Sequence, residues 1–291
     1  GLLAGGGLPG RAGPSAMATP LRRVLVTGAN KGIGRALAKQ LCRDHDFHVL
    51  LGSRDAGRGE EAVRAVLKEA PQCEGRIEPL PIDVSKDSSV ASAAESVAVK
   101  FGKDPAPLYG IVNNAGVGFG LSMEDTLAVN TYGPKRVCDA FLPLLCPSTG
   151  RIVNTASASG PMYVAGCSGE ERRVLIDPAV TWEQLEGLMA KALSSSGREA
   201  YGFSKACLNA YTVLLAREHP HLRINSCTPG FILTDITRGM GATKPPDEGT
   251  KAAIHCLTAE LEANGWYYGS DAVRSPLDRY RGPGDPPYEG P

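Results

Sequence analysis

Three side chains of the sequence have the types and spacing of an acid–base site for a carbonyl group. Tyr201 and Lys205 lie four residues apart in a segment with helical patterning, so both project from one helix face. A phenol with a pKa of about 10 is a poor acid at neutral pH, and a nearby ammonium favours the phenolate and lowers that pKa. Ser157 ends the predicted strand over 150–157, where its hydroxyl could bind a carbonyl oxygen beside the phenol. The three predict a site that polarises a carbonyl and protonates the nascent alkoxide, although the Tyr–Lys pair alone is also compatible with a packed ring beside a solvated lysine.

A glycine-rich turn follows the first predicted strand, residues 24–28. Gly28 permits a tight turn, Gly32 lets backbone amides approach a pyrophosphate, and Gly34 allows the next helix to pack closely on the strand. The N-terminus of that helix then faces the anion. Glycine turns also close strands for steric reasons alone, but the position between a strand and a helix favours a dinucleotide site. The predicted contacts in this turn are Gly28, Asn30, Lys31, Gly32, Ile33 and Gly34.

The end of the second predicted strand favours NADP(H) as the cofactor. An acid at this position binds the ribose 2′-hydroxyl of NAD, whereas a base accommodates the 2′-phosphate of NADP. Arg54 stands there, twenty residues after Gly34, and Lys31 in the glycine turn supplies a second cation. In the alternative interpretation both cations are solvated surface charges and Asp55 selects the cofactor.

The elements that must position these residues alternate between strands and helices, which is the pattern of a parallel sheet covered on both faces. The sequence predicts an α/β, Rossmann-type doubly wound sheet of seven parallel strands, with all carboxyl ends along one ligand-binding edge. The expected strands are residues 24–28, 48–53, 76–83, 109–116, 150–157, 222–230 and 266–269, and the expected helices are residues 33–44, 57–70, 87–101, 123–145, 199–219 and 247–263.

The strand ends supply further candidate cofactor contacts. Two residues after the third strand would flank the adenine, and an asparagine with a small-residue turn after the fourth strand would lie beside the nucleotide. A Pro-Gly turn ends the sixth strand. The residues concerned are Asp83, Val84, Asn113, Ala115, Gly116, Pro229 and Gly230.

One segment, residues 158–198, departs from the alternation. About forty residues separate a strand from the next helix, where such connections are usually a handful long. Apolar residues recur there at helical spacing, which predicts an inserted lid or surface helix. This stripe consists of Trp182, Leu185, Leu188, Met189 and Leu193.

Composition limits the partners and the compartment. The 291 residues carry 31 basic and 31 acidic side chains, so no overall field favours nucleic acid or an anionic membrane, and no apolar run is long enough to span a bilayer. Eight cysteines without a C-x-x-C pair and five histidines without ligand spacing predict reduced thiols, no metal site and a cytoplasmic protein. We expect a disordered leader over 1–20, for which a piece of an organelle transit peptide is the weaker alternative, a catalytic domain over 21–275 and a flexible tail over 276–291.

Six motifs, in chain order, resemble those of the short-chain dehydrogenase/reductases. They span roughly residues 22–270, and the long segment before the tyrosine is similar to that of the branch with monomeric carbonyl reductases and menthone and salutaridine reductases. The motifs are TGANKGIG at 27–34, NNAG at 113–116, Asn130 in VNTYG, Ser157 in IVNTASASG, Tyr201 and Lys205 in YGFSK, and Pro229–Gly230 with Thr234.

The resemblance implies a catalytic set of four residues, Asn130, Ser157, Tyr201 and Lys205. Asn130 would hold a water in a proton relay that reaches Lys205, and Lys205 would also hold the nicotinamide ribose. Ser159 competes with Ser157, but Ser157 matches the second serine of the family's N-x-S-S pattern. Thr234 would bind the nicotinamide carboxamide.

The implied function is NADPH-dependent reduction of a small-molecule ketone or aldehyde, reversible with the alcohol, with Tyr201 as general acid. The alternatives are a 3-ketoacyl-thioester reductase and a catalytically silent NADP-binding sensor. Members of the family commonly dimerise through the helices after the fourth and fifth strands. We expect the apolar stripe of the insertion to cover this face and the protein to be a monomer, whereas a lid over the substrate cleft would leave the face free.

Overall fold

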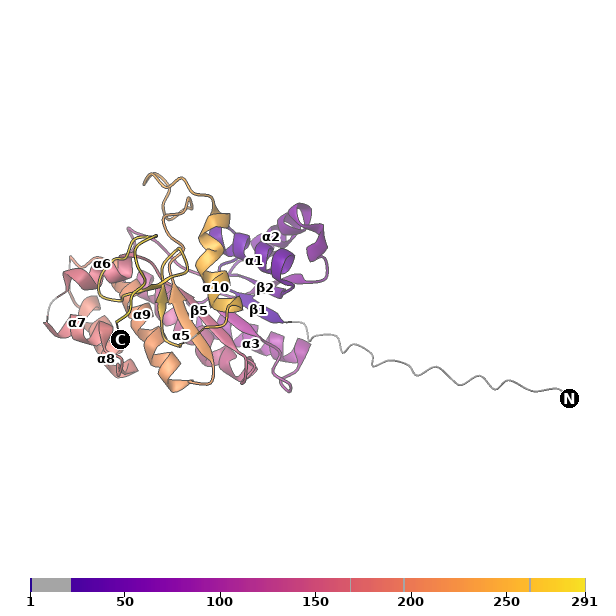
Figure 1. Ribbon diagram of the computed structural model, residues 1–291, viewed down its shortest axis with the longest axis horizontal. Coiled ribbons are helices and arrows are strands. Elements are labelled where there is room, and N and C mark those ends of the chain that lie inside the picture. The colour runs from indigo at the N-terminus through magenta and orange to yellow at the C-terminus, as the bar shows by residue number, and fades with distance from the viewer. Residues whose placement is uncertain (2–21, 168, 196, 262, 291) are drawn as a thin grey trace.

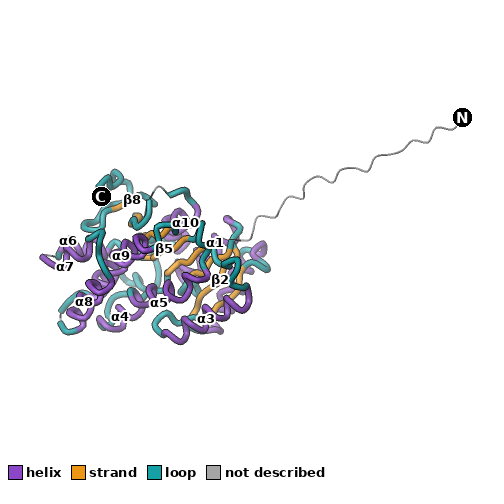
Figure 2. The backbone as a smooth tube through the Cα atoms, turned by 90° about the horizontal axis from the view of Figure 1, so that it is seen from below, coloured by secondary structure: helices purple, strands orange, loops and turns teal. Residues whose placement is uncertain are grey.

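A central sheet lies between two layers of helices (Figure 1, Figure 2). The computed structural model describes residues 1, 22–167, 169–195, 197–261 and 263–290. The predicted leader over 1–20 lies outside the described residues apart from Gly1.

The described residues form an eight-stranded sheet in the order β3-β2-β1-β4-β5-β6-β7-β8. Neighbouring strands run parallel from β3 to β7, and the order changes direction at β1, which makes the crevice between β1 and β4 the topological switch point. The predicted doubly wound α/β fold is therefore confirmed. The strands are β1 Arg23–Val26, β2 His48–Ser53, β3 Ile77–Pro81, β4 Gly110–Asn113, β5 Arg151–Thr155, β6 Arg223–Cys227, β7 Tyr267–Tyr268 and β8 Arg274–Ser275.

The predicted number of seven strands is wrong by one. Strand β8 pairs antiparallel with β7 after a short turn in which Ala272 has a left-handed φ of 67°. Two residues are too few to show the alternation by which a strand is recognised in a sequence.

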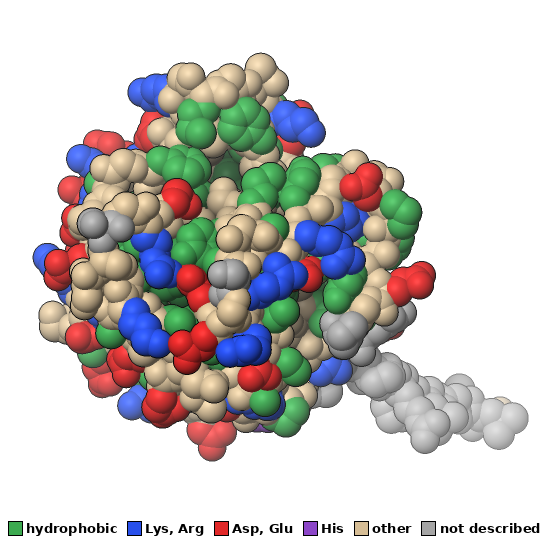
Figure 3. All heavy atoms as spheres, turned by 90° about the vertical axis from the view of Figure 1, so that its left-hand side faces the viewer, with side chains coloured by type: hydrophobic (Ala, Val, Ile, Leu, Met, Phe, Trp, Pro, Cys, Tyr) green, Lys and Arg blue, Asp and Glu red, His purple; other side chains and the backbone are tan. Residues whose placement is uncertain are grey.

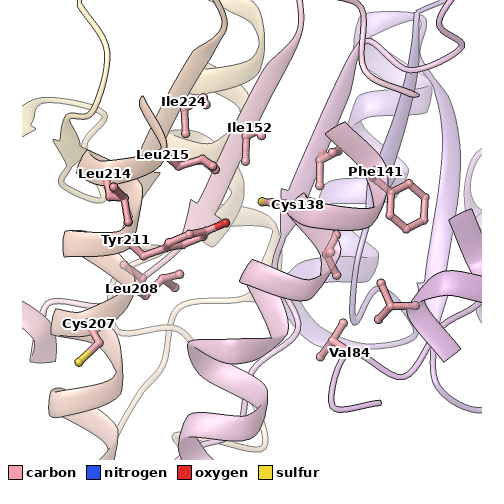
Figure 4. Packing of buried hydrophobic residues seen from close by; sticks show 14 of the residues in the cluster. Val84, Cys138, Phe141, Ile152, Cys207, Leu208, Tyr211, Leu214, Leu215 and Ile224 are labelled. Atoms are coloured by element: carbon pink, nitrogen blue, oxygen red, sulfur yellow. The ribbon is translucent and has the colours of Figure 1, made fainter. Parts of the chain in front are cut away.

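Helices cover both faces of the sheet, and each layer has its own apolar cluster. Helices α1, α2 and α10 pack on one face, whereas α3, α5 and α9 pack on the other, where Tyr211 of α9 points toward Cys138 of α5 (Figure 4). The helices are α1 Gly32–His45, α2 Ala56–Glu69, α3 Asp87–Phe101, α4 Met123–Asn130, α5 Tyr132–Phe141, α6 Ser159–Gly166, α7 Gly169–Ile176, α8 Trp182–Leu193, α9 Ala200–Glu218 and α10 Lys251–Thr258, with 3-10 turns at Pro71–Cys73, Leu142–Leu144 and Pro246–Thr250.

The helix predicted over 123–145 is broken at Asn130. Helix α4 ends there, Thr131 leaves helical geometry, and α5 begins at Tyr132. Pro134 explains the break, because its ring would clash with the carbonyl of Asn130 in a continuous helix and it has no amide to donate to that carbonyl. The break leaves the Asn130 carbonyl without its usual intrahelical partner.

The described residues of the insertion, 158–167, 169–195 and 197–198, form three helices, α6, α7 and α8, instead of the single helix predicted. Helix α8 packs on α4 and α9, and the Trp182 ring lies 5.7 Å from each of the Tyr132 and Tyr211 rings. Leu185, Leu188 and Met189 of the predicted stripe are buried, while the Leu193 side chain at the end of the helix is exposed.

The C-terminal segment has neither helix nor strand over residues 276–290, as its proline and glycine content predicts. It nevertheless contacts the rest of the protein. Arg281 forms a largely buried ion pair with Asp271 at 2.8 Å, and Asp278 pairs with Arg172 of α7 at 2.9 Å. These contacts join the segment to the loop after β7 and to the insertion.

In the described part of the chain, no helix combines the length and apolar composition that a membrane span requires.

Candidate active site

The predicted site residues follow four neighbouring strands at the carboxyl edge of the sheet. The glycine turn follows β1, residues 114–116 follow β4, Ser157 follows β5, and the Pro-Gly turn follows β6. Helix α9 packs against β5 and β6 and carries Tyr201 and Lys205 to the same edge. The remaining predicted contacts lie within these turns, namely Asn30, Ile33, Ala115 and Pro229.

The glycine turn has no room for a side chain at two of its positions. Gly28 has a left-handed φ of +63°, and a Cβ there would lie 2.7 Å from the Ala115 Cα. A Cβ at Gly34 would lie 2.5 Å from the Asn114 Nδ2. Among the described residues, no side chain caps the N-terminus of α1, and its first turn has no acidic residue. The turn thus offers the close backbone approach and the uncapped helix end that fit a pyrophosphate.

Asn114 holds this turn in place. Its Nδ2 donates to the carbonyls of Thr27 at 2.9 Å and Gly28 at 3.3 Å, while the Thr27 hydroxyl accepts from two backbone amides after β4. The side chain of Asn113 is buried elsewhere and donates to Asn154 Oδ1 at 2.9 Å. Asn113 is the asparagine predicted to contact the cofactor, but its side chain is hydrogen-bonded within the sheet and does not lie at the nucleotide edge.

The charges near the second strand are arranged as an NADP(H) site would need. Arg54 is exposed and makes no hydrogen bond or ion pair with another described residue. Asp55 accepts from the Arg58 amide at 2.8 Å and thereby caps α2, which disfavours its use for a ribose hydroxyl. Lys31 pairs with Asp235 at 2.6 Å, but both side chains are exposed, and such a pair contributes little free energy. Lys31 can therefore exchange this partner for a phosphate.

Asp83 and Val84 lie after β3, as predicted. The Asp83 Oδ1 accepts from the Ser85 amide at 3.1 Å and hydroxyl at 2.7 Å. Burial alone would raise the pKa of Asp83, but these two hydrogen bonds, together with the charges of Lys86 and Arg54, lower it. Val84 is buried against Gly133 of α5, and a Cβ at Gly133 would lie 3.0 Å from the Val84 Cγ2. An ionised acceptor and an apolar surface thus stand side by side at the sheet edge.

Tyr201 and Lys205 are both buried at this edge. The Lys205 Nζ donates to the Thr155 carbonyl at 2.8 Å and lies 5.9 Å from the centre of the Tyr201 ring. Burial lowers the pKa of Lys205 to about 8. Burial also raises the pKa of Tyr201, while a hydrogen bond with Ser157 acts in the opposite direction. The spacing of Tyr201 and Lys205 predicts that the ammonium lowers the phenol pKa, but in the structure the desolvation of both groups dominates.

Ser157, and not Ser159, is the serine beside the phenol. Ser157 is the serine whose hydroxyl acts to lower the pKa of Tyr201, and its Oγ accepts from the Ser159 amide at 3.2 Å. Ser159 is the first residue of α6, so its backbone belongs to the helix that leaves the site.

Asn130 is fully buried at the end of α4. Its Oδ1 accepts from a backbone amide of the loop after β4 at 2.9 Å, and its Nδ2 donates to the Ser204 hydroxyl at 3.0 Å. A Cβ at Gly116 would lie 3.4 Å from the Asn130 Oδ1 and 3.6 Å from the Lys205 Nζ. The predicted asparagine and lysine therefore face the same glycine.

The loop after β6 contacts both sides of the site. Gly230 turns the chain with a φ of +87°, and the Thr234 methyl lies 3.6 Å from where a Cβ on Gly32 would be. On the other side, a Cβ at Gly118 would lie 2.7 Å from Ile236. This loop therefore bridges the glycine turn and the loop after β4.

Phe119 is a site residue that the sequence analysis missed. Its ring centre lies 4.5 Å from that of Tyr201, and its side chain is 47% exposed. The available signal was an aromatic residue between two glycines directly after the NNAG motif. Figure 3 shows hydrophobic side chains around a hollow on one face of the molecule. Exposed apolar side chains of the loops after β4 and β6 are Phe119, Leu121, Phe231, Leu233 and Met240.

A glycine turn at the switch point of a doubly wound sheet, opposite a buried Tyr–Lys pair, is the arrangement of a nucleotide-dependent oxidoreductase of the Rossmann class. The family model described as short chain dehydrogenase matches residues 22–169, and the chain belongs to this family.

Two curated proteins and one solved structure illustrate the likeness. (+)-Neomenthol dehydrogenase of Arabidopsis thaliana is 33% identical over 272 residues, with 80% of this chain and 90% of that protein covered. Carbonyl reductase [NADPH] 1 of Macaca fascicularis is 31% identical over 273 residues, with 86% and 95% covered. The structure of salutaridine reductase from Papaver somniferum has a TM-score of 0.74 at 28% identity and covers 85% of this chain and 99% of its own.

Proposed function

We propose that this protein is an NADPH-dependent carbonyl reductase that acts on a ketone or aldehyde and, in reverse, on the alcohol. The observation that carries the proposal is the buried Tyr201, within reach of Ser157 and above Lys205, at the edge where the glycine turn lies. NADP(H) is the cofactor that fits, because Arg54 is free for a 2′-phosphate and Asp55 is engaged as a helix cap. The similar Carbonyl reductase [NADPH] 1 carries NADPH in its name.

The chain's own residues would polarise the substrate and supply the proton. Bound NADPH supplies a hydride to the carbonyl carbon. Ser157 and Tyr201 donate hydrogen bonds to the carbonyl oxygen, and the Tyr201 hydroxyl gives its proton to the oxygen as negative charge develops there. Lys205 stabilises the resulting phenolate through its ammonium. A phenol with the ordinary pKa of about 10 is neutral at physiological pH, and burial raises the pKa of Tyr201 further, so it starts as the acid that reduction requires.

Asn130 is proposed to serve the return of the proton to Tyr201. Its side chain is fully used in holding the loop after β4 and Ser204, whereas its carbonyl has no intrahelical donor because position 134 is proline. That carbonyl can accept from a water, and Gly116 keeps the space between Asn130 and Lys205 open. A water there would link Lys205 to solvent.

The substrate is proposed to be an apolar carbonyl compound. Phe119 forms an aromatic wall on Tyr201, and the exposed apolar residues of the loops after β4 and β6 provide a surface for a hydrocarbon skeleton. A thioester of a carrier or coenzyme would need polar and charged contacts for its long arm. We therefore place ketones and aldehydes before thioesters.

The protein is further proposed to be a cytoplasmic monomer with one catalytic domain over residues 21–275. The buried stripe of α8 covers the α4 and α9 surface, and all eight cysteines are free thiols, which suits a reducing compartment. Light scattering on a sizing column should give a mass near the 30.5 kDa of one chain. A mass twice as large would refute the monomer.

A carbonyl screen tests the function. Purified protein is mixed with NADPH and a panel of cyclic ketones, quinones, aldehydes and a 3-ketoacyl thioester, and absorbance at the reduced nicotinamide band is followed. We expect consumption of NADPH with apolar ketones or aldehydes and formation of the alcohol. Turnover with the thioester alone would support the thioester reductase, and tight NADPH binding without turnover across the panel would support the sensor.

A further inference from the structure

The start of α9 has a cap that is unusual and that acts directly on the tyrosine. Glu199 is the N-cap residue, and its Oε1 accepts from the backbone amide of Tyr201 at 2.8 Å. Its second carboxylate oxygen accepts from the amide of Gly202. Serine, threonine, aspartate and asparagine are the residues preferred at this position. A glutamate that binds two consecutive amides fixes the first turn of the helix, which is the turn that carries Tyr201.

Arg198, the residue before Glu199, is bonded to two helices of the insertion. The Arg198 Nη1 donates to the Tyr163 hydroxyl at 3.0 Å and forms an ion pair with Glu171, and the Tyr163 hydroxyl donates to the Glu171 Oε1 at 2.8 Å. Tyr163 belongs to α6 and Glu171 to α7, and the Arg198 guanidinium lies 5.3 Å from the Phe203 ring of α9. We call Tyr163, Glu171 and Arg198 the clamp. The clamp joins two helices of the insertion to the residue before Glu199.

Helix α6 also approaches α9 closely at the same turn. A Cβ at Gly202 would lie 2.6 Å from the Glu199 Oε2, 2.9 Å from the Ser159 carbonyl oxygen and 3.1 Å from the Tyr163 Cβ. A Cβ at Gly160 would lie 3.1 Å from the Lys205 carbonyl carbon. The two glycines let the insertion press against the turn that carries the Tyr–Lys pair, so a shift of α6 is felt at that turn.

We propose that Glu199 is a positioning residue for Tyr201, and that the clamp extends this role to the insertion. The proposal rests on the proposed function of Tyr201 as general acid. Two effects belong to Glu199. Its hydrogen bonds place the Tyr201 backbone, and its negative charge at the helix N-terminus opposes ionisation of the phenol and so keeps it protonated.

The groups that can influence the titration of the Tyr201 phenol come from α9 and its cap, from the end of β5 and from β7. Glu199 and Lys205 lie on α9 or at its cap, Ser157 contributes its hydroxyl from the end of β5, and Tyr267 lies on β7. Within the clamp, Glu171 and Arg198 form an ion pair with each other. Glu199 is therefore the carboxylate whose removal is expected to move the phenol's titration.

Two substitutions at Glu199 separate placement from charge. Glu199→Ala removes the acceptor and the charge, and we expect kcat for carbonyl reduction to fall about tenfold or more, with the NADPH dissociation constant changed less than about twofold. Glu199→Gln keeps one oxygen that can accept a hydrogen bond from a backbone amide. It should restore most of kcat, while the alkaline step of the kcat/KM profile that reports the phenol, which lies above the step of Lys205, moves to lower pH because the charge that raises the phenol pKa is gone.

Thr181→Ala is the matched control for loss of a cap. Thr181 caps α8 with a capping box and lies in the insertion away from Tyr201. We expect it to lower the midpoint of thermal unfolding about as much as Glu199→Ala does, with kcat and the pH profile unchanged. Equal kcat values for Glu199→Ala and wild type, or a Glu199→Gln profile that coincides with wild type, would overturn the positioning role.

Arg198→Met tests the clamp. It keeps a long unbranched side chain and removes the bonds to Tyr163 of α6 and Glu171 of α7, and we expect kcat to fall in the same direction as for Glu199→Ala but by less. An unchanged kcat in Arg198→Met would overturn the part of the insertion in positioning. These outcomes differ from a failure of the proposed function, in which the wild-type protein itself would turn over no carbonyl substrate.

Discussion

The nucleotide half of the molecule, residues 22–116, and the insertion, residues 158–198, are organised in opposite ways. In the first, neighbours in sequence decide much of the geometry, because the left-handed φ of Gly28 makes the turn after β1 and Asp55 caps α2, the helix directly after it. In the second, distant partners decide it, since Trp182 packs between Tyr132 and Tyr211. Backbone requirements can be recognised from a few adjacent residues, whereas the surface that an apolar stripe covers depends on the whole fold.

The largest expected effect lies at Tyr201, which packs on Phe119 and comes shortly after the insertion in sequence. Tyr201→Phe should lower carbonyl reduction by about a thousandfold, because it removes the proton donor, while the NADPH dissociation constant changes less than about threefold since the ring still packs on Phe119. Steady-state kinetics and cofactor titration by fluorescence measure the two effects. Tyr132→Phe, which removes a phenol beside Trp182 instead, is the control. A Tyr201→Phe enzyme that keeps a tenth of the wild-type rate would place the general acid elsewhere.

The stability that α8 of the insertion contributes should depend on the burial of its apolar side chains. Leu185→Ala removes a fully buried side chain of α8 and should destabilise the protein by about 2–5 kcal/mol. Leu193→Ala, on the same helix but 48% exposed, should cost within about 0.5 kcal/mol. Urea denaturation compares the two variants with wild type. Equal losses of stability would contradict the assignment of α8 as a cover for α4 and α9.

A charge reversal in the nucleotide half should change cofactor preference without changing the fold. Arg54→Asp replaces the exposed cation that we propose binds the 2′-phosphate with a residue of the same charge as the phosphate, and we expect the ratio of NADPH to NADH affinity to fall about tenfold to a hundredfold. Arg64→Asp, an equal charge change on the exposed face of α2, should leave the ratio unchanged. Dissociation constants for both cofactors test this, and a wild-type preference below threefold would remove the role assigned to Arg54.

The smallest effect concerns the stability of the protein without cofactor. Lys205 has a pKa of about 8 in the folded protein against an ordinary 10.5, so the folded state loses this proton first as the pH rises. The destabilisation by the buried ammonium is therefore fully present below pH 8 and disappears between pH 8 and 10.5. Lys205→Met should abolish turnover but stabilise the protein at pH 7 by on the order of 1–3 kcal/mol.

The pH dependence separates this prediction from a simple packing effect. The difference between Lys205→Met and wild type should shrink as the pH rises from 8 toward 10.5, whereas the exposed Lys191→Met should show no such trend. Chemical denaturation of each variant across this range measures it. A Lys205→Met protein less stable than wild type at pH 7 would show that the hydrogen bond to the Thr155 carbonyl outweighs the cost of burial.

The sequence by itself determined the doubly wound sheet, the glycine turn and the order of the motifs along the chain. Each depends on a local requirement, such as a left-handed φ at Gly28 or two side chains four residues apart on one helix. The break in the helix predicted over 123–145 also has a local cause, because Pro134 cannot donate to the carbonyl of Asn130, yet it was not predicted.

Only the tertiary structure decided that Asn114, and not Asn113, contacts the glycine turn and that the Phe119 ring packs on Tyr201. It also decided that burial raises the pKa of Tyr201 and lowers the pKa of Lys205, so that both groups favour their neutral forms. It likewise decided that Arg198 joins α6 and α7 of the insertion to the start of α9. These features arise from contacts between segments far apart in the chain and from the exclusion of water where those segments meet. A single sequence carries no signal for such contacts, because each residue would look the same if its partner lay elsewhere.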